Sequence, residues 1–79
     1  MKNNAWKIGE LVIITEKEKA HEVARFFLRK YRDNARNTLT KIDQNSRVIA
    51  SFVYRDPQEL QDIVQDVINI PYVNKCSVR

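Results

Sequence analysis

The residues of this sequence whose type and spacing most suggest a binding site are basic. Five of them crowd one stretch of the chain: Arg25, Arg29, Lys30, Arg32 and Arg36. Arg25, Arg29 and Arg32 recur at helical spacing, so their guanidinium groups could follow the phosphates of a nucleic acid. A solvated helix face that pairs with acidic neighbours explains the same spacing. Nucleic-acid binding through this stretch is therefore the alternative function that the sequence leaves open.

The acidic residues gather in a different part of the chain. Four of them follow one another at short intervals: Asp56, Glu59, Asp62 and Asp66. The net charge of +4 permits an anionic partner without requiring one. Because the opposite charges are separated along the sequence, we expect the folded molecule to have a basic side and an acidic side. Such a polarity suits self-association as well as it suits nucleic acid.

His21 and Cys76 are the remaining residues that could serve as a nucleophile, a base or a metal ligand. Cys76 is the single cysteine, so it cannot form a disulfide within the chain. One cysteine and one histidine are too few for a structural zinc site. His21 lies at the flank of an expected helix, where a surface position is the better interpretation. We therefore predict no catalytic residues, no metal site, no cofactor and no enzymatic activity.

The length of 79 residues allows one domain with one hydrophobic core, so we assign residues 1–79 to a single domain. The hydrophobic share of 43% and the charged share of 30% are ordinary for a globular protein. The longest apolar run, Leu11 to Ile14, is far too short for a membrane span or a signal peptide. We expect a cytoplasmic protein without a membrane partner.

The stretch from Ser46 to Asp56 predicts a central β-strand. Side chains alternate between the two faces of a strand. One face carries Val48, Ala50, Phe52 and Tyr54, and the other carries Arg47, Ile49, Ser51, Val53 and Arg55. The first face is apolar throughout, and the second still carries two aliphatic residues, which is typical of an interior strand.

The remaining elements follow from periodicity and from end signals. A first strand is expected over residues 7–14, with Gly9 as a bulge or a point of close approach. The run Thr15–Glu18 matches a capping box, which predicts a helix from there to about Arg32. The apolar stripe of this helix comprises Ala20, Val23, Ala24, Phe27, Leu28 and Tyr31.

A half-exposed edge strand is expected over residues 35–43, followed by a short turn at Gln44–Asn45. Asp56 followed by Pro57 opens a second helix, with the acceptor at the N-cap and proline at the first helical position. The stripe of that helix comprises Leu60, Ile63, Val64, Val67 and Ile68. A last strand is expected over residues 72–79.

The order βαββαβ predicts a ferredoxin-like α+β fold: a four-stranded antiparallel sheet with two helices on one face. Right-handed crossovers place the first and third strands in the middle of the sheet.

The C-terminal third of the chain resembles ACT domains and the related RAM effector domains of small transcriptional regulators. The matching positions are Asp56, Glu59, Leu60, Ile70, Pro71 and Val73. The resemblance implies the ferredoxin-like fold and a regulatory role with a small effector. ACT domains usually carry glycine in the loop after the first strand and after the proline, where this chain has Thr15–Glu18 and Tyr72.

The predicted arrangement leaves one sheet face without a covering helix. The interface expected on that face comprises Arg47, Ile49, Ser51, Val53 and Arg55. An open apolar patch of this kind usually marks an interface, so we expect a homodimer. The function that follows is a small non-enzymatic regulatory or interaction module, which acts as an oligomer and binds a small effector or a partner protein.

Overall fold

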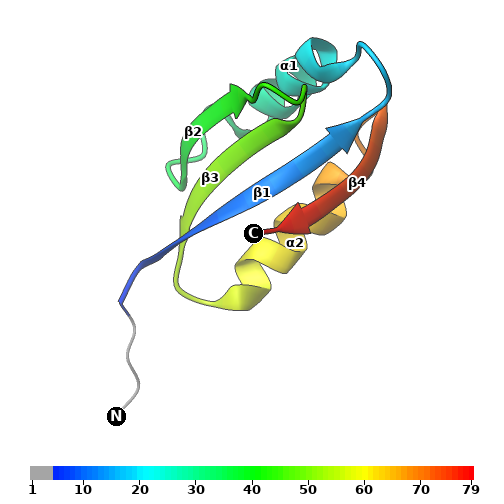
Figure 1. Cartoon of the computed structure of the whole chain (residues 1–79). Coiled ribbons are helices and arrows are strands. Elements are labelled where there is room, and N and C mark those ends of the chain that lie inside the picture. Colours follow the sequence, from blue (N-terminus) through cyan, green and yellow to red (C-terminus); the bar gives the residue numbers. More distant parts are fainter. Residues whose placement is uncertain (1–4) are drawn as a thin grey trace.

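The computed structural model describes residues 5–79, and residues 1–4 of the expected single domain lie outside the described part. Six elements follow one another in the order βαββαβ (Figure 1). They are β1 (Lys7–Thr15), α1 (Ala20–Tyr31), β2 (Asn37–Ile42), β3 (Val48–Tyr54), α2 (Pro57–Val67) and β4 (Val73–Val78). The expected element order and the α+β class are confirmed.

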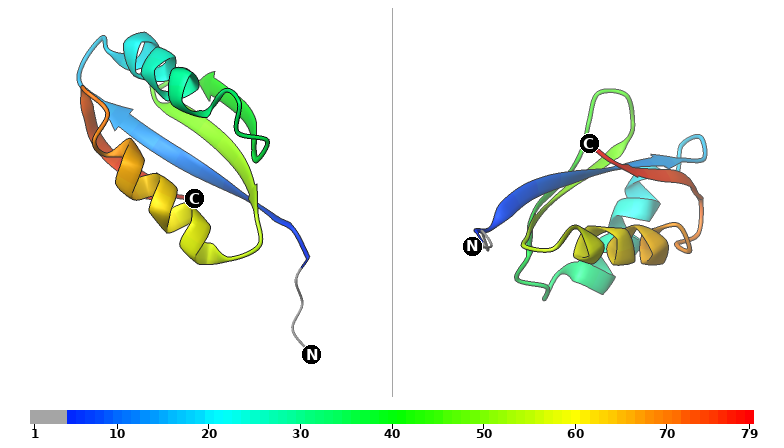
Figure 2. Two further views of the ribbon diagram at one scale, coloured as in Figure 1. Left: turned by 180° about the vertical axis from the view of Figure 1, so that it is seen from behind. Right: turned by 90° about the horizontal axis from the view of Figure 1, so that it is seen from below.

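The four strands form one antiparallel sheet in the order β2-β3-β1-β4. The first and third strands are the interior strands, as the crossover rule predicts. Both helices lie on the same side of the sheet (Figure 2). The expected ferredoxin-like architecture, with two helices on one face, is confirmed.

An aromatic cluster forms the centre of the core between the helices and the sheet. The ring centroids of Phe27 and Phe52 are 5.9 Å apart, and those of Tyr31 and Phe52 are 5.8 Å apart, both in edge-to-face arrangement. Phe27 and Phe52 are fully buried. Edge-to-face pairs of this kind contribute about 0.5–1.5 kcal/mol each beyond the area they bury, so the cluster joins α1 firmly to β3.

The apolar stripes of both helices face the sheet, with one exception in each. The stripe residues of α1 are buried or half-buried apart from Leu28, which is 42% exposed. Ile68, the last residue of the predicted stripe of α2, follows the end of the helix and is 43% exposed. Both residues stand eight positions after the first residue of their stripe, and this position lies at the edge of the helix face that contacts the sheet.

Gly9 is a point of close approach between β1 and α2. A Cβ atom at this position would lie 2.8 Å from the Cδ1 atom of Leu60 and 3.1 Å from the Cε1 atom of Tyr54. The pairing of β1 with β3 runs through Gly9 without a register shift. The sequence allowed Gly9 to be either a bulge or a point of close approach, and the structure shows close approach without a bulge.

The start of α2 agrees with the sequence signal in detail. The Asp56 carboxylate accepts a hydrogen bond of 3.0 Å from the backbone N–H of Gln58. The Glu59 side chain in turn accepts one of 3.1 Å from the backbone N–H of Asp56, which completes a capping box. Pro57 occupies the first helical position, where its missing N–H has no cost.

The capping box expected at Thr15–Glu18 is wrong, and α1 begins only at Ala20. Lys19 occupies the N-cap without a side-chain cap bond. Thr15 still pairs with Val73 as the last residue of β1, and the N–H of Glu16 donates to the carbonyl of Tyr72. Since β4 holds this backbone in the sheet, the helix cannot start before the chain reverses at Glu18, whose φ is 65°.

The hairpin between β2 and β3 is one residue longer than the expected turn at Gln44–Asn45. The N–H of Ser46 donates to the carbonyl of Asp43, and the N–H of Asp43 donates to the carbonyl of Arg47. Ser46 has a φ of 59°. A turn followed by one left-handed residue is the usual three-residue hairpin loop, in which glycine is the preferred residue at the last position.

Replacing Ser46 by glycine is expected to stabilise the fold. The left-handed conformation costs a residue with a Cβ atom about 1–2 kcal/mol, whereas glycine loses about 0.5–1 kcal/mol of unfolded-state entropy. Ser46→Gly should therefore raise the free energy of unfolding by up to about 1 kcal/mol, measured by urea denaturation. The matched control Gln44→Gly lies in the same loop without a positive φ and should lower it. Equal effects of both changes would contradict the argument.

Candidate functional site

The sheet face opposite the two helices is the open face (Figure 2). The register of the strands arranges its side chains in rows that cross the sheet. The central row comprises Lys41, Ile49, Val12 and Ser77. One neighbouring row comprises Leu39, Ser51, Glu10 and Arg79, and the other comprises Arg47, Ile14 and Lys75. An apolar pair thus lies at the centre, with charged and polar groups around it.

The apolar centre of the open face is closed to water. Ile49 is 2% exposed and Val12 is 6% exposed. The open patch expected from the sequence placed Ile49 in solvent, and this is wrong. Long side chains of the neighbouring rows can lay their aliphatic stems over apolar groups while their charged ends stay in water. The alternation of residues along one strand does not reveal this kind of cover.

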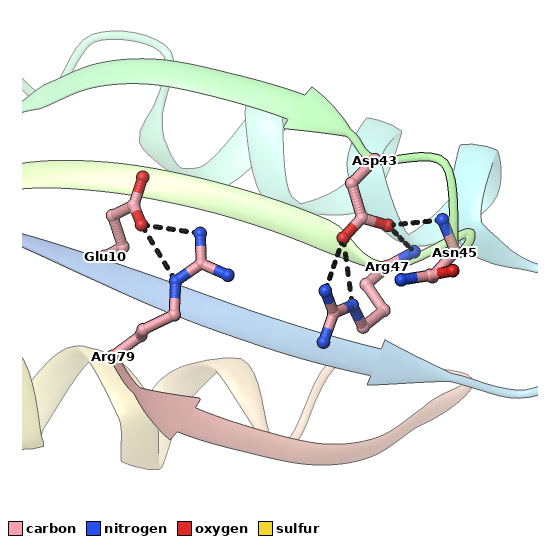
Figure 3. Close-up of polar contacts among 5 residues, drawn as sticks. All are labelled: Glu10, Asp43, Asn45, Arg47 and Arg79. Atoms are coloured by element: carbon pink, nitrogen blue, oxygen red, sulfur yellow. Dashed lines mark hydrogen bonds and ion pairs between the residues drawn. The ribbon is translucent and has the colours of Figure 1, made fainter.

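Two ion pairs lie in the rows on either side of the apolar centre, and they are called the bracketing ion pairs below (Figure 3). The Nε and Nη2 atoms of Arg79 lie 3.0 and 2.7 Å from the Oε1 atom of Glu10. The Nε and Nη2 atoms of Arg47 lie 2.9 and 2.8 Å from the Oδ2 atom of Asp43. Each guanidinium group therefore makes two contacts to one carboxylate oxygen.

These contacts lower the pKa of both carboxyl groups. The hydrogen bond from Arg79 is the main cause of the lowered pKa of Glu10, and the positive charges of Arg79 and Lys41 add to it. The backbone N–H of Arg47 is the main cause for Asp43, together with the Arg47 side chain and the N–H of Asn45. Hydrogen bonds and cations favour the charged form of a carboxylate, so both pairs persist in mildly acidic solution.

One end of the open face carries exposed apolar groups beside two arginines. The exposed or half-exposed apolar side chains there are Ile8, Leu39 and Val53, of which Ile8 is 73% exposed and Leu39 is 54% exposed. The guanidinium groups of Arg55 and Arg36 lie 4.4 and 5.1 Å from the ring centroid of Trp6. The indole is thus held by cation–π contacts at the end of the sheet, with 49% of its surface in water.

The five residues expected to form an interface lie along one face of β3, with half-buried Arg47 just before the strand and Arg55 just after it. Within this set, Ile49 is buried, Ser51 and Val53 are half-buried, and Arg55 is exposed. Sequence reasoning missed the groups that the other three strands bring to the same face: Glu10, Lys41, Lys75 and Arg79. Their alternation was visible, but the register that assigns them to this face was not.

The five basic residues considered for nucleic acid differ in their ion pairing. Arg25 and Arg29 are exposed on α1, and among residues 5–79 neither makes an ion pair within 4 Å. The other three have carboxylate partners, since Lys30 contacts Asp66, Arg32 contacts Asp33 and Arg36 pairs with Glu59.

A pocket of about 370 Å³ lies between the β1–α1 loop and the β2–β3 hairpin. Its lining comprises Ile14, Thr15, Glu16, Lys17, Glu18, Asn45, Ser46 and Arg47. Glu18 and Ser46, two of the residues with positive φ, belong to this lining. Most of the lining residues are polar or charged and Ile14 is the exception, whereas small-molecule sites are usually lined by apolar side chains.

The residues weighed for catalysis lie apart from one another. His21 is exposed on α1, and Cys76 is half-buried in β4. Burial raises the pKa of the Cys76 thiol to about 11, so the thiol stays protonated at neutral pH and is a weak nucleophile. Within residues 5–79, no three His, Cys, Asp or Glu side chains are placed to share a metal ion. The helices of the same part are too short or too polar to cross a membrane.

The fold and the open face place this chain among small α+β proteins of the ferredoxin-like class. It is similar to the solution structure of the E. coli Tat proofreading chaperone protein NapD, with a TM-score of 0.68 and 17% sequence identity. The similarity covers 95% of this chain and 76% of NapD, so it extends well beyond the C-terminal third. No protein-family model and no curated protein matches the sequence.

The bracketing ion pairs make stability depend on pH. A carboxyl group whose pKa is lower in the folded than in the unfolded protein stabilises the fold above its unfolded pKa, and this contribution is lost as the pH falls through the folded pKa. The free energy of unfolding should therefore fall more steeply below about pH 4.5 for the wild type than for Glu10→Gln/Asp43→Asn. Urea denaturation at a series of pH values measures both slopes, and equal slopes would contradict this assignment.

Proposed function

We propose that this protein is a small non-enzymatic module that binds another protein through the open face of its sheet. The observation that carries the proposal is the composition of that face. It combines an apolar centre, three further apolar side chains at one end, and charged groups that pair across strands. Apolar groups surrounded by polar ones are typical of protein interfaces.

The similarity to NapD also supports a protein-binding role. NapD is described as a proofreading chaperone, and a chaperone acts on other polypeptides. A sequence identity of 17% supports the fold, so the chaperone-like role of this chain is part of the proposal. We propose an extended segment of a partner as the occupant, because Ile8 and Val53 are cross-strand neighbours and Leu39 lies in the next row, so the exposed apolar groups form a band at one end of the face.

The homodimer expected from the sequence is the simplest form of this proposal, since a second copy of the chain is itself a protein partner. The apolar atoms available to it are those of Ile8, Leu39, Val53 and Ile14 and not those of Ile49. The ACT-like and RAM-like regulatory role and the small effector also stay proposals. We place the protein in the cytoplasm, where a single free cysteine such as Cys76 stays reduced.

A library of short random peptides tests the proposal. Selected peptides should bind along the strands, which chemical-shift mapping by NMR records residue by residue. Leu39→Arg puts a cation at the exposed apolar end and should weaken binding by roughly tenfold or more. The matched control Gln65→Arg adds the same charge to the exposed side of α2 and should leave binding unchanged. Peptides that map to the helices, or a selection that enriches none, would refute the proposal.

Nucleic-acid binding is the second candidate, because Arg25 and Arg29 are exposed and free of carboxylate partners within residues 5–79. If both contact phosphates, affinity should fall steeply with rising salt, and Arg25→Glu/Arg29→Glu should abolish it. The control Lys17→Glu/Lys75→Glu makes the same change in charge outside α1, on the loop before the helix and on β4. Gel-shift titration at low salt measures the three proteins, and the absence of any complex at micromolar wild type would rule this candidate out.

A further inference from the structure

The apolar centre of the open face is buried although no helix of residues 5–79 lies over it (Figure 2). Ile49 and Val12 are 2% and 6% exposed, whereas Ile14 at the next open-face position of β1 is 38% exposed and Ile8 is 73% exposed. All four side chains point to the same side of the sheet. Ile8 lies beyond the pairing with β4 and has a neighbouring strand on one side only, whereas Val12 has strands on both sides, whose side chains can cover the centre. The cover of the centre is therefore local.

The register shows which side chains surround the centre. Arg47 and Ser51 precede and follow Ile49 by two residues on β3, and Glu10 precedes Val12 by two residues on β1. Arg79 follows Ser77, the partner of Val12 on β4, by two residues, and its backbone N–H donates to the carbonyl of Glu10. Diagonal neighbours in a sheet are within reach of long side chains.

The bracketing ion pairs hold these long side chains across the sheet. Arg79 reaches from the end of β4 to Glu10 on β1, and Arg47 turns back to Asp43 at the hairpin, so that the two pairs lie on opposite sides of the central row (Figure 3). Without the carboxylates, both guanidinium groups would be free to extend into water. Glu10 and Asp43 thus determine the direction of the arginine stems.

We propose that the bracketing ion pairs form a displaceable cover over Val12 and Ile49, which a binding partner must open to reach the apolar centre. The opening of the cover by a partner rests on the proposed function, whereas the cover itself is a property of the free protein. In the free state the arginine stems keep the apolar pair out of water and make the face polar. Once the pairs open, the centre becomes continuous with the apolar end at Ile8 and Leu39.

The relaxation of methyl protons by a water-soluble gadolinium chelate tests the cover in the free protein, with no partner present. In the wild type, the methyl groups of Val12 and Ile49 should relax as slowly as those of the core residue Val23, and those of Ile8 much faster. In Glu10→Gln/Asp43→Asn, the rates at Val12 and Ile49 should rise severalfold while the rate at Val23 stays unchanged. Rates at Val12 and Ile49 that stay at wild-type values would overturn the cover.

A matched control and a second measurement separate the possible outcomes. Asp33→Asn/Asp62→Asn removes two exposed carboxylates away from the open face and should leave the rates at Val12 and Ile49 unchanged. If the double variant fails to fold, each single variant, Glu10→Gln or Asp43→Asn, removes one of the two ion pairs and should raise the rates at Val12 and Ile49 by a smaller factor. A cover that is confirmed while no peptide binds would overturn the proposed function alone.

Discussion

The antiparallel pairing of β1 with β3 is the constraint on which the rest of the structure depends. Side chains alternate with a period of two, so a slip of one residue would exchange the two faces of an interior strand. In the observed register, Leu11 and Ile13 face the helices, and Val12 and Ile14 lie on the open face. The same register brings Gly9 beneath Leu60, where a side chain on β1 would collide with α2.

The parts of the fold that local sequence determines could be predicted, and the failures lie where distant segments meet. The cap at Asp56 works because all of its partners lie within three residues. The similar pattern at Thr15 fails because β4 pairs with that residue from more than fifty positions away. At the site, the alternation of residues predicted which side chains of β3 share the open face. The burial of Ile49 could not be predicted in this way, because it depends on side chains of the neighbouring strands, and only the register brings these together.

In the described residues 5–79, three turns contain a residue other than glycine with left-handed backbone, which shows how strongly tertiary contacts determine this fold. Glu18, Ser46 and Tyr72 have φ values of 65°, 59° and 72°, and the single glycine is used for packing in β1. Each such residue costs about 1–2 kcal/mol, so contacts around it must offset the cost. At Tyr72 the carbonyl accepts from the N–H of Glu16, and the ammonium group of Lys19 lies 4.6 Å from the ring centroid.

The apolar side chains on the two faces of the sheet are shielded from water in different ways. On one face, the two helices bury the core, which includes the aromatic cluster around Phe52. On the other face, the apolar area around Val12 and Ile49 is small enough for arginine stems to shield it, and arginine suits this task because its stem is apolar and its guanidinium group keeps several donors in water. Exposed ion pairs contribute little to stability, so a cover that depends on them can be displaced without loss of the fold. A sheet protected in this way can therefore stay folded alone and still offer an apolar centre to a partner.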